Sequence, residues 1–260
     1  MQRREFLVHG ATGVLIGCSP ALSVAPASPR SKPEARAPIR GVCFDLFTLF
    51  DPRSVVEVAR AISPERAVAL CEAWRVRQFE YAPLRVAAGR YVDFRVVTKD
   101  ALEYAARSQA VHLTDAQREE LVDAYSRLEP WPDARATLLA FRSAGLRLSP
   151  LANYSPRMLS RLLENSGFAE LFDAQISTDA ARTFKPDPRA YALGVATLKL
   201  PREQIAFAAF GGWDAAGAKW FGYPTFWVNR LGVPHEELAP GFDSTGPSLA
   251  ELAAFVRDWA

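Results

Sequence analysis

Cysteine is scarce in this sequence, and neither sign of charge dominates. The 260 residues include three cysteines, Cys18, Cys43 and Cys71, whose spacing fits neither a metal-binding motif nor a disulfide framework. Lys and Arg total 31 against 29 for Asp and Glu, and the basic residues are dispersed, which argues against nucleic acid as a partner. After residue 40 no apolar run is long enough to span a membrane. The length suits one large domain, or a core with an inserted subdomain.

The first 38 residues differ in composition from the rest of the chain. Arg3 and Arg4 stand directly before an apolar segment that ends at Gly17, which is the arrangement of a twin-arginine export signal. An Ala/Pro/Ser-rich stretch then continues to Pro38 and is typical of a flexible leader. We therefore expect residues 1–38 to be a signal and leader, and the protein to be periplasmic or otherwise exported.

Processing of this leader has two alternatives. Leu15-Ile16-Gly17-Cys18 resembles a bacterial lipobox, which would leave a lipid anchor on Cys18. Ala25-Pro26-Ala27 instead offers a small-residue cleavage site that would release a soluble protein. A fortuitous arginine pair at a cytoplasmic N-terminus is the third interpretation. The sequence alone leaves all three open.

The stretch Gly41–Asp51 is the most informative part of the chain. Its apolar run contains one carboxylate, Asp45, and ends at Asp51-Pro52, which is typical of a buried strand in a parallel sheet. Burying an unpaired Asp is costly, and ligands of doubly wound folds lie at the carboxyl ends of the strands. We therefore place Asp45 at the ligand-binding edge of the sheet. The alternative is an ordinary Asp that caps the next turn.

The rest of the chain predicts an α/β fold. Residues 53–129 show helical periodicity without strand-like alternation, with helices expected at 64–81, 83–88, 94–107 and 115–128. From residue 130 helices alternate with strands, expected at 146–151, 172–177, 205–210 and 225–229. Such alternation favours a parallel sheet with right-handed crossovers. We expect a Rossmann-like, doubly wound core of residues 39–52 and 130–260, with residues 53–129 inserted as an all-helical cap.

Four polar residues follow predicted strands or precede predicted helices of this core: Asp45, Asn153, Lys185 and Asp214. They lie within longer motifs, which are Phe44–Asp51, Trp74-Arg75 in the cap, Phe184-Lys185-Pro186 with Tyr191, and Trp213–Lys219. In unbroken order from Ile39 to Arg230, these motifs resemble the haloacid dehalogenase superfamily, and within it the type II 2-haloacid dehalogenases.

The resemblance implies hydrolysis of a small 2-haloalkanoic acid to a 2-hydroxy acid and halide. Asp45 would attack the halogen-bearing carbon, and water would then hydrolyse the aspartyl ester. Lys185 would hold Asp45 ionised, and Asp214 would fix Lys185 and help to activate the water. Thr48 would hydrogen-bond Asp45 or the substrate.

The same resemblance implies a set of residues that bind the substrate and the departing halide. These residues are Arg75, Asn153, Phe47, Tyr191 and Trp213. Arg75 and Asn153 would stabilise the halide by charge and hydrogen bonding. The family resemblance also makes a homodimer an expectation.

Metal-dependent phosphatases of the superfamily carry a second Asp two residues after the nucleophile, where this chain has Phe47. They also carry paired acids in their last motif, whereas this chain supplies Asp214 alone. A hard cation requires several oxygen ligands. We therefore predict no metal ion, no other cofactor and no phosphoryl transfer.

Several positions depart from the family pattern. The first motif lacks the Gly that commonly precedes the residue at Thr48, and Ala152, Ala209 and Gly211 replace an expected Ser, Ser and Asn. Losing positioning hydrogen bonds lowers catalytic rates. Two alternatives to haloacid hydrolysis therefore stay open: a hydrolase of another small carboxylate or ester, and an exported binding protein with impaired catalysis.

Overall fold

The computed structural model describes residues 36–259. The predicted twin-arginine signal, the lipobox at Cys18 and the Ala27 cleavage site all lie outside the described residues. Within residues 36–259, no helix combines the length and apolar character that a membrane crossing requires.

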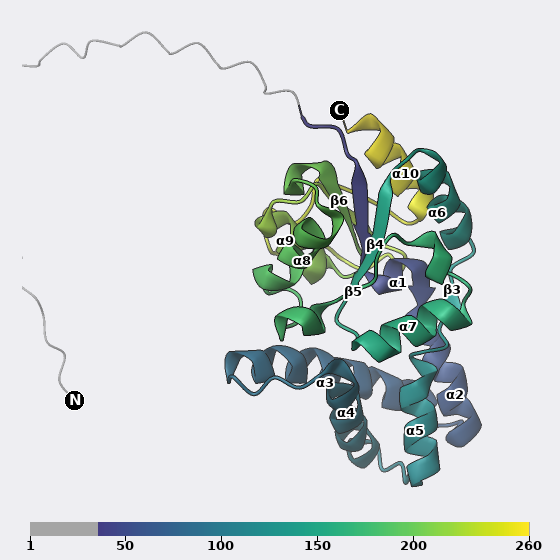
Figure 1. Ribbon diagram of the computed structural model, residues 1–260. Helices are drawn as coiled ribbons and strands as arrows, with labels where there is room; N and C mark the ends of the chain where they lie inside the picture. Colours follow the sequence, from purple (N-terminus) through teal and green to yellow (C-terminus); the bar gives the residue numbers. More distant parts are fainter. Residues whose placement is uncertain (1–35, 260) are drawn as a thin grey trace, which may run out of the picture. The chain divides into compact units, whose positions relative to one another are not determined.

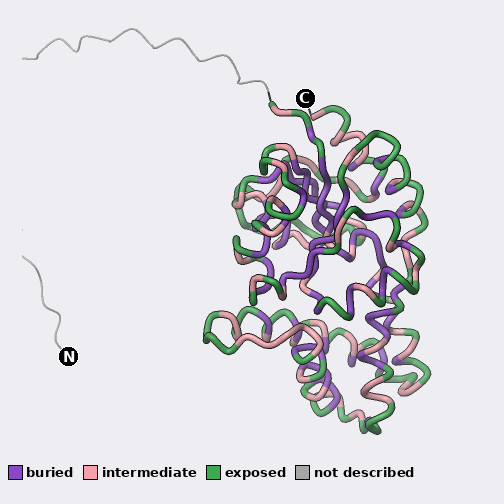
Figure 2. Tube along the Cα trace, viewed as in Figure 1, coloured by how far each residue is buried: buried purple, intermediate pink, exposed green. Residues whose placement is uncertain are grey.

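A parallel sheet forms the centre of the core (Figure 1). It has six strands in the order β5-β4-β1-β6-β7-β8. Its strands are β1 (Gly41–Phe44), β4 (Arg147–Ala152), β5 (Ile176–Ser177), β6 (Ile205–Ala209), β7 (Thr225–Val228) and β8 (Ser244–Gly246). β1 lies between β4 and β6, and all four of its residues are buried (Figure 2). An apolar run without alternation suits a strand that is covered on both faces.

Helices cover both faces of the sheet. Val42 and Phe44 pack into one apolar cluster with residues of α6 (Ala134–Ser143), α7 (Pro156–Asn165) and α10 (Leu249–Asp258). Cys43 points to the opposite face and packs with residues of α8 (Pro188–Leu198) and α9 (Gly212–Phe221). The predicted doubly wound α/β core is confirmed.

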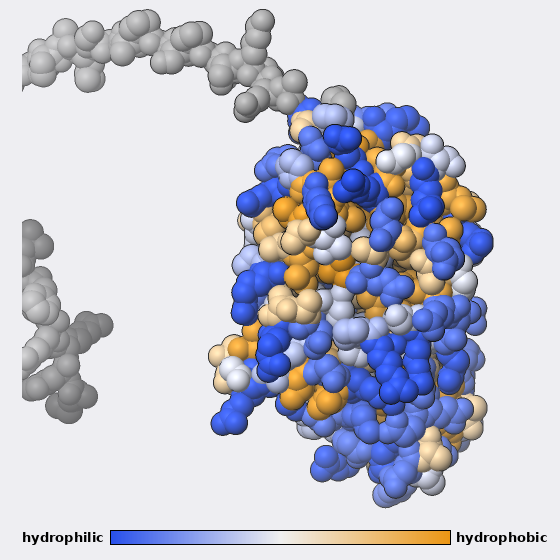
Figure 3. Space-filling model, viewed as in Figure 1, coloured by the Kyte–Doolittle hydropathy of each residue, from blue (hydrophilic) through white to orange (hydrophobic). Residues whose placement is uncertain are grey.

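Helices α2 (Val55–Ile62), α3 (Ala67–Ala87), α4 (Phe94–Ser108) and α5 (Asp115–Ala124) form the cap. A short antiparallel pair, β2 (Phe50–Asp51) with β3 (Glu129–Pro130), joins its two ends. The indole of Trp74 in α3 donates a buried 2.8 Å hydrogen bond to the carbonyl of Thr98 in α4. On the face shown in Figure 3, hydrophilic residues cover most of the cap.

Short helical turns connect several of these elements. They are α1 (Leu46–Leu49) and the 3₁₀ turns at Pro52–Ser54, Ala169–Leu171, Thr178–Ala181 and Arg202–Gln204.

Helix α3 differs from the prediction at both ends. Pro64 was expected in its first turn, but the helix begins at Ala67. It then passes through Pro83 to Ala87, where two helices had been expected. A proline inside a helix removes one backbone hydrogen bond, yet the buried residues Leu70, Trp74 and Ala82 hold α3 against its neighbours.

The edges of the sheet also differ from the prediction. A strand was expected over residues 172–177, but only Ile176 and Ser177 pair with β4. At Asp173 a single backbone hydrogen bond to the carbonyl of Leu148, at 2.9 Å, remains, and the Asp173 carboxylate accepts the N–H of Leu148 at 2.7 Å, where a strand would present a backbone carbonyl. Strand β8 and helix α10 were not predicted. The Ser-Thr-Gly sequence of β8 carries no apolar pattern.

Candidate active site

The predicted polar residues converge at the carboxyl edge of the sheet. Asp45 directly follows β1, Asn153 directly follows β4, and Lys185 lies in the loop before α8. Asp45, Asn153 and Lys185 line a cavity of about 450 Å³. Residues of the core and of cap helices α3 and α4 both line this cavity, so the cap covers the strand ends where the polar groups meet.

Lys185 joins two carboxylates. Its Nζ lies 2.7 Å from Asp45 Oδ1 and 2.7 Å from Asp214 Oδ2. The side chains of Lys185 and Asp214 are each 1% exposed, while that of Asp45 is 14% exposed and faces the cavity. A buried charge requires a partner, and each charge here has one. Asp45 is therefore held in place by an ammonium group and keeps one oxygen for a ligand.

Burial and charge act together on the pKa values of this group. Burial disfavours the ammonium form of Lys185, but the carboxylates of Asp214 and Asp45 outweigh it and raise the pKa of Lys185. Burial raises the pKa of Asp214 to about 6, against the opposing effect of Lys185. Lys185 is therefore charged at neutral pH. Asp214 is more basic than an ordinary aspartate and can take up a proton near pH 6.

Tyr191 was expected to bind substrate, and the structure corrects this assignment. Its side chain is fully buried, does not line the cavity, and donates a 2.7 Å hydrogen bond to Asp214 Oδ1. Asp214 Oδ1 is thus held by Tyr191 and Asp214 Oδ2 by Lys185. Tyr191 orients the carboxylate from behind and stays out of contact with the cavity.

Asn153 presents its amide NH₂ group to the cavity. Its Oδ1 accepts the backbone N–H of Lys185 at 2.8 Å, which fixes the orientation of the side-chain amide. Its Nδ2 has no hydrogen-bond partner among residues 36–259. Asn153 therefore both holds the Lys185 loop and offers two N–H donors to a bound anion.

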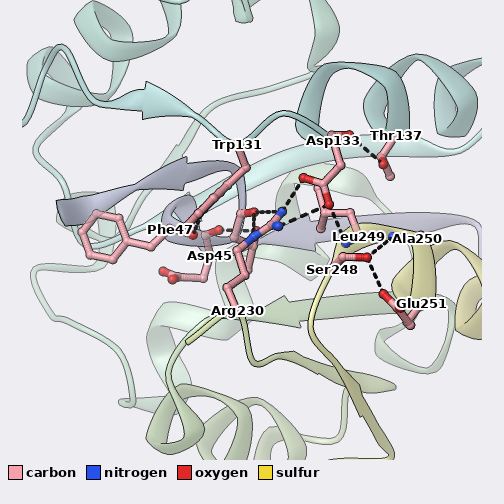
Figure 4. A network of polar contacts seen from close by, with 11 residues as sticks. Asp45, Phe47, Trp131, Asp133, Thr137, Arg230, Ser248, Leu249, Ala250 and Glu251 are labelled. Atoms are coloured by element: carbon pink, nitrogen blue, oxygen red, sulfur yellow. Dashed lines mark hydrogen bonds and ion pairs between the residues drawn. The ribbon is translucent and has the colours of Figure 1, made fainter. Parts of the chain in front are cut away.

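Thr48 holds the backbone of the turn that follows Asp45, and its hydroxyl makes no hydrogen bond with the Asp45 carboxylate. Its hydroxyl donates a 2.7 Å hydrogen bond to the carbonyl of Asp45. Arg230 donates from Nε and Nη2 to the carbonyl of Thr48, at 3.0 and 2.8 Å, and Trp131 Nε1 donates to the carbonyl of Phe47 at 3.0 Å (Figure 4). The side chains of Thr48, Trp131 and Arg230 thus clamp the turn that carries Asp45 by binding three of its backbone carbonyls.

Asp133 holds the Arg230 side chain in turn. Its two carboxylate oxygens accept from Arg230 at 2.7 and 3.2 Å, and one also accepts the N–H of Leu249 at 3.0 Å (Figure 4). Burial alone would raise the pKa of Asp133, but the hydrogen bonds from the Arg230 guanidinium and from the Leu249 N–H outweigh burial and lower this pKa. The position of Asp45 therefore depends on residues from the start of α6 and from the segment after β7.

Arg75 brings a positive charge into the cavity from cap helix α3. Its guanidinium lies 5.0 Å from the Phe47 ring, 5.2 Å from the Phe79 ring and 5.9 Å from the Phe210 ring. Among the described residues no acid forms an ion pair with Arg75. An arginine held by aromatic faces alone is available to an anionic ligand.

The cavity wall is otherwise largely aromatic. Phe47 and Trp213 line it, as predicted, together with Phe79, Phe94 and Phe210. Trp213 of the core meets Phe79 of the cap edge-to-face, with ring centroids 5.4 Å apart. These aromatic rings make much of the cavity surface apolar.

The donor set does not suit a divalent metal ion. The ammonium of Lys185 already lies between the carboxylates of Asp45 and Asp214. Over residues 36–259, no three His, Cys, Asp or Glu side chains come together as metal ligands would. Hard cations take about six oxygen ligands.

Sequence reasoning missed two contributors to this site. Trp131 and Arg230 carry no motif of their own, and only the fold brings them to the turn of Asp45. Tyr154 also lines the cavity, and its buried hydroxyl has no hydrogen-bond partner in the described part of the chain. No local sequence signal reports such tertiary contacts.

Comparison with known proteins agrees with this geometry. Residues 39–222 match the family model for haloacid dehalogenase-like hydrolases. The chain belongs to this family. The haloacetate dehalogenase H-2 of Moraxella sp. (strain B) is 37% identical over 219 residues, which are 84% of this chain and 98% of that protein. The (S)-2-haloacid dehalogenase of Pseudomonas sp. (strain YL) is 39% identical over 201 residues, which are 77% of this chain and 87% of that protein.

The fold of this dehalogenase-like hydrolase is also similar to solved structures of haloacid dehalogenases. The L-2-haloacid dehalogenase of Xanthobacter autotrophicus, with chloropropionic acid covalently bound, aligns with a TM-score of 0.80 at 34% identity. The alignment covers 85% of this chain and all of that one.

Proposed function

We propose that this protein hydrolyses the carbon–halogen bond of a 2-haloalkanoic acid to give a 2-hydroxy acid and halide. The observation that carries the proposal is the position of Asp45. Its carboxylate lies at the cavity wall, fixed by Lys185 on one oxygen, while Arg75 and Asn153 offer anion-binding donors to the same cavity.

In the first step, one carboxylate oxygen of Asp45 attacks C2 of the substrate. A carbon–oxygen ester bond forms as the carbon–halogen bond breaks, and the halide leaves with the bonding electron pair. Arg75 and the Asn153 amide stabilise the negative charge that develops on the halogen. The clamp of Thr48, Trp131 and Arg230 keeps Asp45 in position for this attack.

In the second step, water hydrolyses the ester at the carbonyl carbon of Asp45. Esterification removes the negative charge of Asp45, so one of the two carboxylates that stabilise the Lys185 ammonium is lost. Lys185 can then pass its proton to Asp214 as it accepts a proton from the attacking water. The acyl C–O bond then breaks, and the departing alkoxide takes the proton of the added hydroxyl group to become the 2-hydroxy acid. The Asp45 carboxylate is regenerated, and Asp214 releases its proton to restore the starting state.

The test measures halide release from haloacetates and from both enantiomers of 2-chloropropionate, with EDTA present and Asp45→Asn as the control. We expect release that survives EDTA and disappears in the variant. Release lost with EDTA would contradict the metal-free route. Turnover of carboxylate esters without halide release would favour the other hydrolase, and ligand binding without any turnover would favour the binding protein.

We also propose that the chain is exported through the twin-arginine route. Arg3 and Arg4 ahead of an apolar segment support this proposal. Cell fractionation of the natural chain and of an Arg3→Lys, Arg4→Lys variant tests it, and we expect the variant to stay in the cytoplasm. The mass of the mature protein distinguishes a lipidated Cys18 from cleavage after Ala27, and sedimentation tests the proposed homodimer.

A further inference from the structure

The cavity is larger than a short haloacid requires. A 2-chloropropionate ion has six non-hydrogen atoms, and at about 30 Å³ for each, the volume of a water molecule in the liquid, it fills less than half of the 450 Å³. Cavities above about 300 Å³ are of the size that holds drug-like ligands. A short haloacid would therefore leave more than half of the cavity volume to a larger substituent.

Two positions of the cavity wall carry smaller residues than the family pattern expects. Ala152 and Gly211 both line the cavity. A Cβ atom on Gly211 would lie 2.6 Å from Nε1 of Trp213, so only glycine allows the indole to lie against this position. The indole therefore forms an apolar wall where the family pattern expects an amide.

The reacting groups all lie on the core side of the cavity. Besides Asp45, Lys185 and Asn153, the core lines the cavity with apolar side chains that include Phe47, Phe210 and Trp213. Apart from Arg75 and Gln78, the cap provides apolar side chains, namely Phe79, Ala82, Pro83 and Phe94. The amide of Gln78 is already bonded to Thr98 and Tyr125, so it offers the ligand little. The space beside the reacting groups thus favours an uncharged, apolar group.

We propose that the substrate is a 2-haloacid whose C2 carries a large apolar substituent, and that aromatic rings are preferred in this position. The inference rests on the proposed dehalogenase function and deepens it. Edge-to-face and offset-stacked contacts with Phe79, Phe94 and Trp213 favour a ring over an alkyl chain of similar size.

The experiment compares halide release by the full chain from chloroacetate, 2-chloropropionate, 2-chlorohexanoate and 2-chloro-3-phenylpropionate. The phenyl group of the last compound is one carbon away from C2, so the intrinsic reactivity of its C–Cl bond stays close to that of 2-chloropropionate. We expect kcat/KM to be at least tenfold higher for 2-chloro-3-phenylpropionate than for 2-chloropropionate, with 2-chlorohexanoate between them. Lactate and 3-phenyllactate, used as inhibitors, should differ in the same direction.

The outcomes separate this inference from the function on which it rests. Equal or faster turnover of 2-chloropropionate would overturn the large substituent and leave the dehalogenase function standing. Absence of halide release from all four compounds would overturn the dehalogenase function as well.

A pair of variants locates the substituent. Ala82→Leu adds volume to the cap side of the cavity, and Ala87→Leu adds the same volume at an exposed position of the same helix. We expect Ala82→Leu to lower the ratio of kcat/KM for 2-chloro-3-phenylpropionate over 2-chloropropionate at least fivefold, and Ala87→Leu to leave that ratio unchanged. An unchanged ratio in a folded Ala82→Leu protein would contradict the assignment of the substituent to the cap.

Discussion

Lys185 in the core and Arg75 in the cap are the two cations of this cavity, and their surroundings differ. Lys185 is fully buried and shared between two carboxylates at 2.7 Å, with Tyr191 holding Asp214 from behind. Arg75 lies among aromatic rings, with no acid partner in residues 36–259. Lys185 fixes the Asp45 carboxylate through an ion pair, whereas Arg75 is available to bind an anion. The core therefore determines the chemistry, and the cap contributes to which molecule is bound.

Removing the core cation should have the largest effect. Lys185→Met leaves the carboxylates of Asp45 and Asp214 facing each other without a cation. We expect the halide-release rate to fall by about 10³-fold or more and the free energy of unfolding to fall by about 3 kcal/mol at pH 7. Kinetics and urea denaturation measure both quantities. Full stability in this variant would contradict the buried pairing.

Removing the cap cation should affect activity alone. For Arg75→Met we expect kcat/KM to fall by about 10²-fold, because the charge that stabilises the leaving halide is lost. Stability should change little, because no ion pair breaks. Arg77→Met, on the same helix, is the matched control and should keep its activity, since Arg77 pairs with Glu80 outside the cavity. An equal loss of kcat/KM in Arg75→Met and Arg77→Met would contradict a specific role of Arg75 in the cavity.

The core triad should also respond to pH. Because the pKa of Asp214 rises from 3.8 to about 6 in the folded protein, its ionisation should appear as a rise in activity through pH 6. Stability should depend on pH in the opposite direction. The raised pKa of Asp214 adds to the free energy of unfolding below pH 4, and this contribution is lost as the pH rises through 6. The pH profile of kcat/KM, which reports ionisations of the free enzyme, measures the first effect. A profile that is flat from pH 5 to 7 would contradict the role of Asp214.

The clamp on the nucleophile's turn should have a smaller effect. Arg230→Lys keeps the charge but cannot donate at once to the carbonyl of Thr48 and to Asp133. We expect kcat to fall about tenfold with KM nearly unchanged, since the turn loses positioning while the cavity keeps its lining. A matching rise in KM would instead point to a change in substrate binding.

Tyr154 should give the smallest effect. Its buried hydroxyl has no hydrogen-bond partner in the described residues, so Tyr154→Phe removes an unsatisfied polar group. We expect the free energy of unfolding to rise by about 1 kcal/mol. Thermal denaturation without ligand measures this change. A loss of stability would show that the hydroxyl is satisfied in solution.

The sequence was sufficient for the features that depend on order and local pattern. The alternation of strands and helices gave the doubly wound core, and a single carboxylate in an apolar strand pointed to Asp45. The positions of Asn153 and Lys185 at the same cavity followed from the family motifs. Each of these features is determined by residues that lie close together in the sequence.

Other features depend on contacts between distant parts of the chain. Tyr191 carried a family motif, but only the fold shows that its hydroxyl reaches Asp214 and stays out of the cavity. Arg230 lies 182 positions from the Thr48 carbonyl that it holds, which no local pattern reports. Helix α3 continues through Pro83 because its packing against the rest of the cap outweighs local preference.

The most direct test of the central claim follows a single turnover in H₂¹⁸O with the enzyme in excess over 2-chloropropionate, or over 2-chloro-3-phenylpropionate if that compound reacts faster. If Asp45 forms an ester that water opens at its carbonyl carbon, the label enters the peptide that contains Asp45, and the first 2-hydroxy acid released carries none. Label in the first product and none at Asp45 would show direct attack by water, and would contradict the nucleophilic role of Asp45.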